Sequence, residues 1–332
     1  MNSGQQAERV RAGAGLFRRS DRGVVLVRGG DRVRWLQGML SNDVAALEAG
    51  PTASGCTAAL LNHRAGVVAD FQVALRPDAF WLECERSVLP EVIERLGKFI
   101  VADDVELLDG SDRLDLLGLE GPRAGDWLAA ALGAAEPPAL AANAVGEIAL
   151  AGETAVLGAW GSSGESAYRL VVPAGTGEAV CRALGAAKGP GELVEADAQA
   201  LEILRIEAGV PRMGFELGED VLPDEARLEA AVSDTKGCYT GQEIIARLRS
   251  RGRVNHLLVG LRFTGAAPAA LEAKLRTPER EVGEVTSACV SPSEGAIGLG
   301  FVRREHASPG TQLDAAGESV TVAALPFLPA AR

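Results

Sequence analysis

The sequence predicts an α+β protein in which two mixed α+β units precede a small all-β unit. Strand-like and helix-like patterns alternate up to Leu108, and a similar order follows from Leu114 to Leu184. From Leu257 onward, short apolar runs are separated by Pro, Gly and Ser. A chain of 332 residues is also too long for one ordinary core. The expected units are residues 1–110, 111–250 and 251–332.

The first unit is expected to begin with a strand, since the dozen residues at the N-terminus look loose. Val33, Leu36 and Leu40 share one face of a predicted helix, and Ser87 is the predicted N-cap of an amphipathic helix. The expected strands are Val24–Val27, Cys56–Leu61, Val67–Leu75, Phe80–Cys84 and Val105–Leu108, and the expected helices are Asp31–Leu40 and Ser87–Phe99.

The second unit repeats this order without any residue-level repeat, so a duplication is only a topological hypothesis. An Ala- and Pro-rich segment, Ala134–Val145, is expected to be an exposed connection. The expected strands are Leu114–Leu119, one near Ile148, Ala155–Trp160 and Tyr168–Val172, and the expected helices are Arg123–Leu132 and Gly177–Leu184.

The third unit is predicted to be a small β-barrel or sandwich. Four short apolar runs recur with turn residues between them, which is typical of such folds. The runs are Leu257–Phe263, Glu281–Val290, Ala296–Val302 and Val320–Leu325.

Composition excludes several classes of function. The net charge of −12 disfavours general nucleic-acid binding, which needs a positive surface. The chain has no apolar run of membrane-spanning length and no secretory signal, so we expect a cytoplasmic protein with no membrane partner. Five scattered cysteines and three isolated histidines argue against a disulfide framework and against a metal site.

The most informative segment reads Lys-Gly-Cys-Tyr-Thr-Gly-Gln-Glu, residues 236–243. Thr240 and Glu243 have capping-box spacing, which predicts a helix that starts just after Thr240. Cys238 then lies before a helix N-terminus and two residues from Lys236, and both features favour a thiolate. The alternative is a glycine turn with an inert, packed cysteine.

This octapeptide resembles the signature of the YgfZ family of folate-binding proteins, which are related to the glycine-cleavage T-protein and to a mitochondrial iron–sulfur assembly factor. Three further segments agree: Leu204–Gly209 resembles the LRxEAG segment shared with the T-protein, Pro223–Ala226 a P-x-E-A stretch, and Gln37–Val44 an N-terminal QGxxTNDV. The matching blocks span roughly residues 24–260.

The resemblance implies two ferredoxin-like α+β halves and a C-terminal β-barrel around a central opening that binds tetrahydrofolate or another reduced folate. It implies an accessory protein that supports assembly or repair of iron–sulfur enzymes, with transient contacts to iron–sulfur proteins or assembly factors and with Cys238 as the functional thiol. If the protein is an enzyme, the resemblance implies a tetrahydrofolate-dependent one-carbon transferase.

The resemblance also implies roles for two carboxylates. Glu207 is assigned to the pterin, whose amino and ring N–H edge a carboxylate can bind with two hydrogen bonds; the alternative is a surface ion pair with Arg205 or Arg212. Asp70, on one face of a strand with Gln72, is assigned to the one-carbon transfer; the alternative is a solvated sheet face. The remaining residues assigned to folate binding are Arg205, Lys236, Tyr239, Gly241, Gln242 and Arg247.

Arginines at every second position from Arg247 to Arg253 would line one face if this segment were extended, and they would then face the folate glutamate tail. Only Arg247 belongs to the motif, and the others are more simply a solvated face.

Two other functions are weighed against the accessory role. An aminomethyltransferase, the T-protein itself, is disfavoured because the octapeptide replaces the T-protein's block and because Ala69-Asp70-Phe71 departs from its Asp-Asp-Leu. A folate-binding part of a larger oxidoreductase is disfavoured because no GxGxxG follows the first strand.

Overall fold

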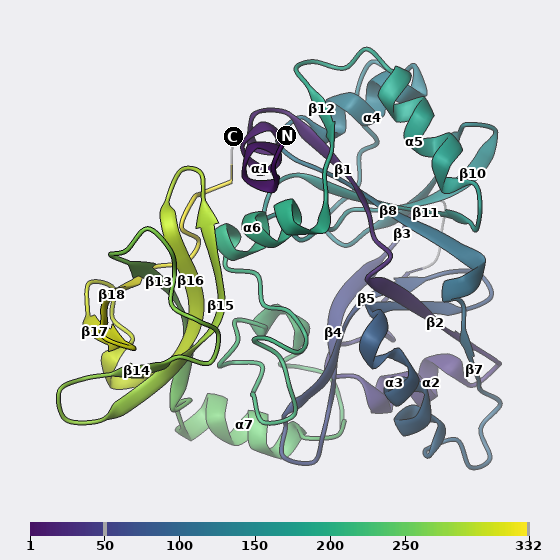
Figure 1. Ribbon diagram of the computed structural model, residues 1–332. Helices are drawn as coiled ribbons and strands as arrows, with labels where there is room; N and C mark the ends of the chain where they lie inside the picture. The colour runs from purple at the N-terminus through teal and green to yellow at the C-terminus, as the bar shows by residue number, and fades with distance from the viewer. Residues whose placement is uncertain (49–51, 331–332) are drawn as a thin grey trace.

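The computed structural model describes residues 1–48 and 52–330, and three lobes meet around one central helix, α6 (Ala198–Ala208) (Figure 1). Each of two lobes consists of a β-sheet with helices packed on it, and the third is a closed six-stranded barrel. The predicted α+β fold class is confirmed. Among the described residues, no helix is long and apolar enough to cross a membrane.

The first sheet has five antiparallel strands in the order β4-β5-β6-β2-β7. Helices α2 and α3 cover one of its faces, where Leu36 and Leu96 pack against Val25 and Val27. The strands are β2 (Arg22–Arg28), β4 (Gly55–Leu61), β5 (Val67–Leu75), β6 (Phe80–Glu85) and β7 (Glu106–Asp109), and the helices are α2 (Arg32–Met39) and α3 (Leu89–Gly97).

The second sheet has seven strands in the order β12-β1-β8-β11-β10-β9-β3 and is covered by α4 (Ala124–Leu132) and α5 (Gly177–Ala186). It takes in two strands from the first 110 residues, so the chain crosses between the sheets. The unit boundaries at 110 and 250 stay a prediction. The strands are β1 (Ala14–Arg18), β3 (Thr52–Ala53), β8 (Leu114–Glu120), β9 (Val145–Leu150), β10 (Glu153–Gly158), β11 (Ala167–Pro173) and β12 (Leu193–Glu195).

The two sheets pack against each other through their remaining faces. Val24 and Leu26 of β2 point away from the helices and meet Leu116, Val156 and Val171 of the second sheet. Because alternate residues of a strand face opposite ways, β2 is apolar on both sides. A cavity described below opens at the edge of this inter-sheet contact.

The barrel closes in the order β13-β16-β15-β14-β17-β18 and has its own apolar core. Helix α6 lies between the barrel and β1, since Leu204 and Ile206 pack in one cluster with Phe17, Ile297 and Leu299. The strands are β13 (His256–Phe263), β14 (Lys274–Arg276), β15 (Glu281–Ser291), β16 (Gly295–Arg303), β17 (Gln312–Ala315) and β18 (Glu318–Ala323).

The N-terminus is ordered, and the prediction of a loose N-terminal dozen is wrong. Helix α1 (Ser3–Ala12) begins with a capping box between Asn2 and Gln5 and buries Ala7 and Val10 against α6. With only two buried apolar residues in ten, the helix has too weak an amphipathic pattern for the sequence to show.

Three local predictions differ from the structure. Ser87 lies in a 3₁₀ turn, and α3 begins at Leu89 with no side-chain cap. Val33 is exposed, and Trp35, rather than Val33, packs in the core beside Leu36. Helix α7 (Gln242–Arg251) starts near the expected residue, but its N-cap is Gly241, in the left-handed conformation, rather than Thr240.

Candidate functional site

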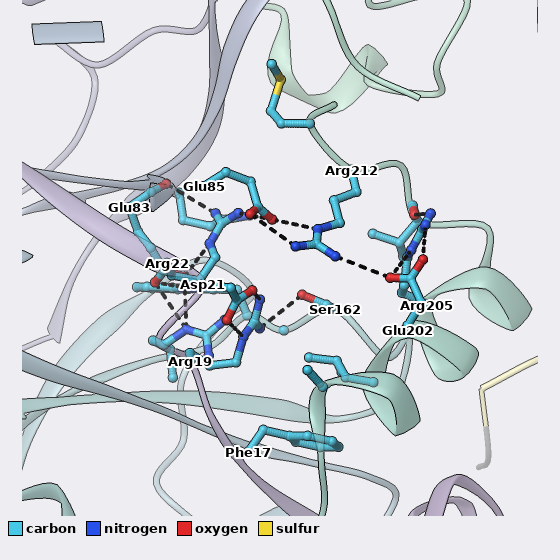
Figure 2. A pocket seen from close by; sticks show the side chains of 18 of the residues that line it. Phe17, Arg19, Asp21, Arg22, Glu83, Glu85, Ser162, Glu202, Arg205 and Arg212 are labelled. Atoms are coloured by element: carbon cyan, nitrogen blue, oxygen red, sulfur yellow. Dashed lines mark hydrogen bonds and ion pairs between the residues drawn. The ribbon is translucent and has the colours of Figure 1, made fainter. Parts of the chain in front are cut away.

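A cavity of about 900 Å³, counting the space at its opening, lies between the first sheet, the turn after β1, residues 160–162 and helix α6 (Figure 2). Arginines and carboxylates dominate its lining, among them Arg19, Arg22, Arg169, Arg205, Arg212, Asp21, Asp70, Glu83, Glu85 and Glu202.

Asp70 and Gln72 enter the cavity from β5. Ala69, Phe71 and Val73 point to the opposite face and are buried in the core of the first unit, which is the alternation expected of a strand. Asp70 Oδ1 and Gln72 Oε1 are buried, and neither has a hydrogen-bond partner in the part of the chain that the structure describes. A buried polar atom without a partner is costly, so these two oxygens mark a place where a ligand can bind.

The surroundings of Asp70 favour its protonated form. Burial raises the pKa of Asp70, the Arg22 guanidinium opposes this rise, and the nearby Glu85 carboxylate adds to it. A carboxyl with a raised pKa in a cavity is suited to exchange protons with a ligand.

Arg22 joins the carboxylates on the same face of the first sheet. Its Nε lies 3.2 Å from Glu83 Oε1 and its Nη1 lies 3.4 Å from Glu85 Oε1. Glu83 also accepts from Trp160 Nε1 at 3.0 Å and pairs with Arg169 Nε at 3.0 Å. Burial opposes the ionisation of Glu83, but Arg169 and Arg22 together hold its pKa below the usual value. Glu83 is therefore an anion that fixes two arginines and a tryptophan at the cavity wall.

Helix α6 forms the facing wall with residues at helical spacing, Ala198, Leu201, Glu202 and Arg205. Arg212 spans the gap between the walls: its Nε lies 3.1 Å from Glu85 Oε1 on β6, and its Nη1 lies 3.5 Å from Glu202 Oε2 (Figure 2). This bridge ties α6 to the first sheet.

Arg205, which the sequence assigned to folate, has no donor left for a ligand. Its five N–H groups meet both oxygens of Glu202, the carbonyl of Val210, Glu216 Oε2 and Ser287 Oγ. A guanidinium has five N–H donors, so this hydrogen-bond set is complete. Arg205 thus joins α6 to the barrel and to the loop that carries Arg212.

Glu207, assigned to the pterin, lies outside the cavity lining. It lies five positions after Glu202, so it projects from another face of α6. It is buried, and it accepts from Arg11 Nε at 2.6 Å and from Ser291 Oγ at 2.5 Å. The structure gives Glu207 partners within the chain, and its proposed contact with a pterin stays untested.

The octapeptide at 236–243 also lies away from the cavity, against α2 and the turn between β4 and β5. Lys236 Nζ donates to the carbonyls of Gln37 (2.7 Å), Leu40 (2.5 Å) and Asn42 (2.9 Å), which uses its three N–H groups. Burial lowers the pKa of Lys236 to about 8, while Asp43 opposes the fall. The lysine acts as a clamp on the chain segment that follows α2.

Tyr239, Gly241, Gln242 and Arg247 share this location. Tyr239 is buried beside Lys236, whose Nζ lies 5.2 Å from the ring centroid. Gly241 has a φ of 84°, and a Cβ there would come within 2.9 Å of the Asn62 carbonyl oxygen, so only glycine fits. Gln242 and Arg247 belong to α7, so the condition considered from the sequence, an extended segment after Arg247, is not met. On a helix, residues two apart point to nearly opposite sides.

Cys238 is exposed beside this loop, and Cys56, Cys84, Cys181 and Cys289 are free thiols with little or partial exposure. No group of three or more His, Cys, Asp and Glu side chains able to hold a metal ion occurs within residues 1–48 and 52–330.

Comparison with known proteins identifies the fold. The family model described as the GCVT N-terminal domain matches residues 2–236, and that of the glycine cleavage T-protein C-terminal barrel domain matches residues 257–328. The chain belongs to the glycine cleavage T-protein family. The placement in a T-protein-related folate-binding family is thereby confirmed, although the relatives found are not named as members of the YgfZ branch.

Relatives along the whole chain carry the same activity name. The aminomethyltransferase of Pelodictyon phaeoclathratiforme is 30% identical over 92% of this chain and 83% of its own length. That of Rubrobacter xylanophilus is 31% identical over 90% of this chain and 78% of its own. The solved structure of the glycine cleavage system aminomethyltransferase T from Bartonella henselae superposes with a TM-score of 0.86 at 26% identity, covering 98% of this chain and 90% of its own.

These similarities overturn the expected role in iron–sulfur enzyme assembly, including the contacts with iron–sulfur proteins. That role was drawn from an eight-residue motif, whereas the similarity to aminomethyltransferases spans the chain. The motif packs against a hairpin turn outside the cavity, and Asp70 stands in the cavity even without the second aspartate of the T-protein pair. The alternative weighed from the sequence, an aminomethyltransferase, is the better supported function.

Two residues predicted from the sequence, Asp70 and Arg205, line the cavity, and the other charged groups around Asp70 were missed. Arg22, Glu83 and Arg169 come from three strands of two sheets, and none stands in a recognisable motif. The signal that was present is a charged residue at each of these positions within otherwise apolar strands.

We expect Lys236→Met to destabilise the protein without changing ligand affinity. The change leaves three carbonyls without their shared donor, and the free energy of unfolding should fall by roughly 3 kcal/mol. Urea unfolding measures the loss, and calorimetry with tetrahydrofolate tests the affinity. A stable variant with weakened folate binding would show instead that the octapeptide contacts the ligand.

Proposed function

We propose that this protein is a folate-dependent aminomethyltransferase, which transfers the carbon of an aminomethyl group to a reduced folate bound in the cavity beside Asp70. The observation that carries the proposal is Asp70 itself: its Oδ1 is buried without a hydrogen-bond partner among the described residues and its pKa is raised, in a charged cavity of a T-protein fold. The names of the full-length relatives agree with it.

The cavity has the groups that a reduced pterin needs. A pterin ring offers N–H donors and a carbonyl acceptor on its edges, and the cavity offers Asp70 Oδ1 and Gln72 Oε1 as unpartnered acceptors and Arg169 Nη1 as an unpartnered donor. Trp160, Phe17 and Met213 supply apolar surface for the ring faces. The residues present therefore fit a reduced folate, and tetrahydrofolate is the cofactor that we assign.

Tetrahydrofolate, when bound, supplies the nucleophilic nitrogen that takes the carbon. Asp70 is placed to hold the proton that this nitrogen loses as its bond to carbon forms. Burial and Glu85 favour the neutral form of Asp70, and Arg22 favours its charged form, with a net rise of the Asp70 pKa. Arg212 and Glu202 form an ion pair at the wall of the cavity that faces the first sheet.

A finer proposal concerns the branch of the family. The octapeptide at residues 236–243 supports a place in the YgfZ branch by its resemblance alone, and no relative named here carries that name. The octapeptide lies at the hairpin turn, so the branch and the chemistry of the cavity are separate questions.

The test of the proposed function is a binding and transfer experiment with the whole chain. Under anaerobic conditions, calorimetry with tetrahydrofolate should show one site per chain. With an isotopically labelled S-aminomethyl dithiol as donor, nuclear magnetic resonance should show the label in methylenetetrahydrofolate together with release of ammonia. Absence of tetrahydrofolate binding sinks the proposal, and binding without transfer limits the protein to a folate carrier.

A further inference from the structure

The cavity contains one guanidinium whose terminal nitrogens are free. Arg169, on β11, is 2% exposed and lines the cavity. Its Nε is held by Glu83, with N–O distances of 3.0 and 3.1 Å to the two carboxylate oxygens. Within the described residues, no hydrogen bond reaches either terminal nitrogen, and Nη1 is fully buried. An arginine placed so deeply and used through only one of its donors is unusual.

The other cavity arginines do not share this property. Arg19 pairs with Asp21, Arg22 with Glu83 and Glu85, and Arg212 with Glu85 and Glu202. Arg205, as shown above, has used all five donors.

The space beside Arg169 is kept open by a glycine. Gly118 of β8 stands opposite Arg169 in the sheet, and a Cβ there would come within 3.1 Å of both Arg169 Nη1 and Glu120 Oε1. Glu120 is itself buried, with Oε2 held by the amides of Ser162 and Ser163 and with Oε1 in an ion pair with Arg19 Nη1 at 3.7 Å. A side chain at position 118 would push the guanidinium from its place.

This arrangement determines which part of a bound folate would contact Arg169. The glutamate tail of a folate is flexible and charged, and it needs a path to solvent. A group that is 2% exposed at the inner wall meets the ring instead. Asp70 and Gln72, on the other sheet, accept from the N–H groups of the ring, which leaves a ring acceptor for Arg169. The ring's one carbonyl oxygen, at position 4, is the strongest such acceptor.

We propose that Arg169 is a specificity-determining residue that donates from its free terminal nitrogens to the 4-oxo oxygen of the pterin ring. The proposal rests on the proposed function, since it takes a folate as the ligand of the cavity. It makes the site one for 4-oxo pterins, and it predicts rejection of analogues that carry a 4-amino group. Such an analogue places an N–H donor against a guanidinium that has no acceptor to offer.

The experiment compares tetrahydrofolate with 4-amino-4-deoxytetrahydrofolate by anaerobic calorimetry. Wild-type protein should bind the 4-oxo form at least about 10-fold more tightly, and Arg169→Met should lose about 10- to 100-fold in affinity for the 4-oxo form, the range for hydrogen bonds to a charged group. The affinity of Arg169→Met for the 4-amino form should change little, so the preference disappears.

Two further variants keep the test decisive. Arg169→Lys keeps the positive charge beside Glu83 but lacks the two terminal nitrogens of the guanidinium. It should therefore fold and still lose most of the preference for the 4-oxo form. Arg9→Met, at an exposed ion pair, is the control and should keep the full preference. A folded Arg169→Lys or Arg169→Met variant with the wild-type preference overturns the inference and makes Arg169 a structural partner of Glu83. Tight binding of both ligands by wild type overturns it as well, while absence of any folate binding removes the proposed function itself.

Discussion

Asp70→Asn should lower kcat for one-carbon transfer by roughly 100- to 10,000-fold, the range that general acid–base groups contribute. The amide keeps the size of the carboxyl but cannot take a proton from the folate nitrogen. Tetrahydrofolate affinity should change by much less than the rate, because Gln72 and the remaining cavity wall are unaltered. Rapid-quench measurement of methylenetetrahydrofolate, with calorimetry for binding, gives the two quantities separately.

A matched control for this variant is Asp78→Asn, at an exposed ion pair with Arg28. It makes the same chemical change away from the cavity and should leave kcat unaltered. If Asp70→Asn retains wild-type kcat, the proton of the folate nitrogen goes elsewhere and the assigned role of Asp70 is wrong.

The raised pKa of Asp70 adds a pH dependence to the same prediction. As a base, Asp70 must be ionised, so the acid limb of kcat/KM should lie above the ordinary aspartate value of about 3.9. A folded pKa above the unfolded one means that the group stabilises the fold at low pH and that this stabilisation is lost as pH rises through the folded pKa. Asp70→Asn should therefore unfold at a higher temperature than wild type at neutral pH, which scanning calorimetry can show.

Much of the fold could be predicted from the spacing of apolar residues and from the turn residues between the apolar runs. The two-residue alternation of Val67–Leu75 placed Asp70 and Gln72 on one face, and the structure shows that face in the cavity. Short apolar runs after Leu257 predicted a barrel, which the structure closes with six strands. Strand β1 and helix α1 escaped notice because their partners are distant in the sequence: β1 pairs with β8 and β12, and α1 packs on α6.

The cavity was harder to predict, because a charged residue in a motif does not reveal which groups its side chain contacts. Arg205 and Lys236 stood in recognisable segments and were assigned to the ligand, yet all their donors are used within the chain. Arg169 stood in no motif, and its free donors appear only once its neighbours on β8 and β6 are known. Hydrogen-bond saturation depends on residues distant in sequence, so it cannot be read from spacing.

Arg205→Met should cost about 3–5 kcal/mol of the free energy of unfolding, the effect of removing one partner from a buried ion pair. Glu216 is fully buried and would lose the Arg205 guanidinium, with Thr286, Ser287 and the amide of Arg212 as its remaining donors. Urea unfolding followed by fluorescence measures the loss. Tetrahydrofolate affinity, measured below the unfolding transition, should fall only to the extent that the variant displaces Arg212 from the cavity wall.

The double variant Arg205→Met with Glu216→Leu separates a structural role from a ligand-binding one. Replacing both members of a buried pair by apolar residues removes the unpaired charge, so this variant should recover part of the stability lost in Arg205→Met. Arg9→Met, which breaks only an exposed pair, should cost about 1 kcal/mol or less. If Arg205 instead bound folate directly, the double variant would regain stability but would still bind tetrahydrofolate weakly, because the contact with the ligand would be missing. Recovery of both stability and affinity, by contrast, follows from an arginine whose five donors all end within the protein.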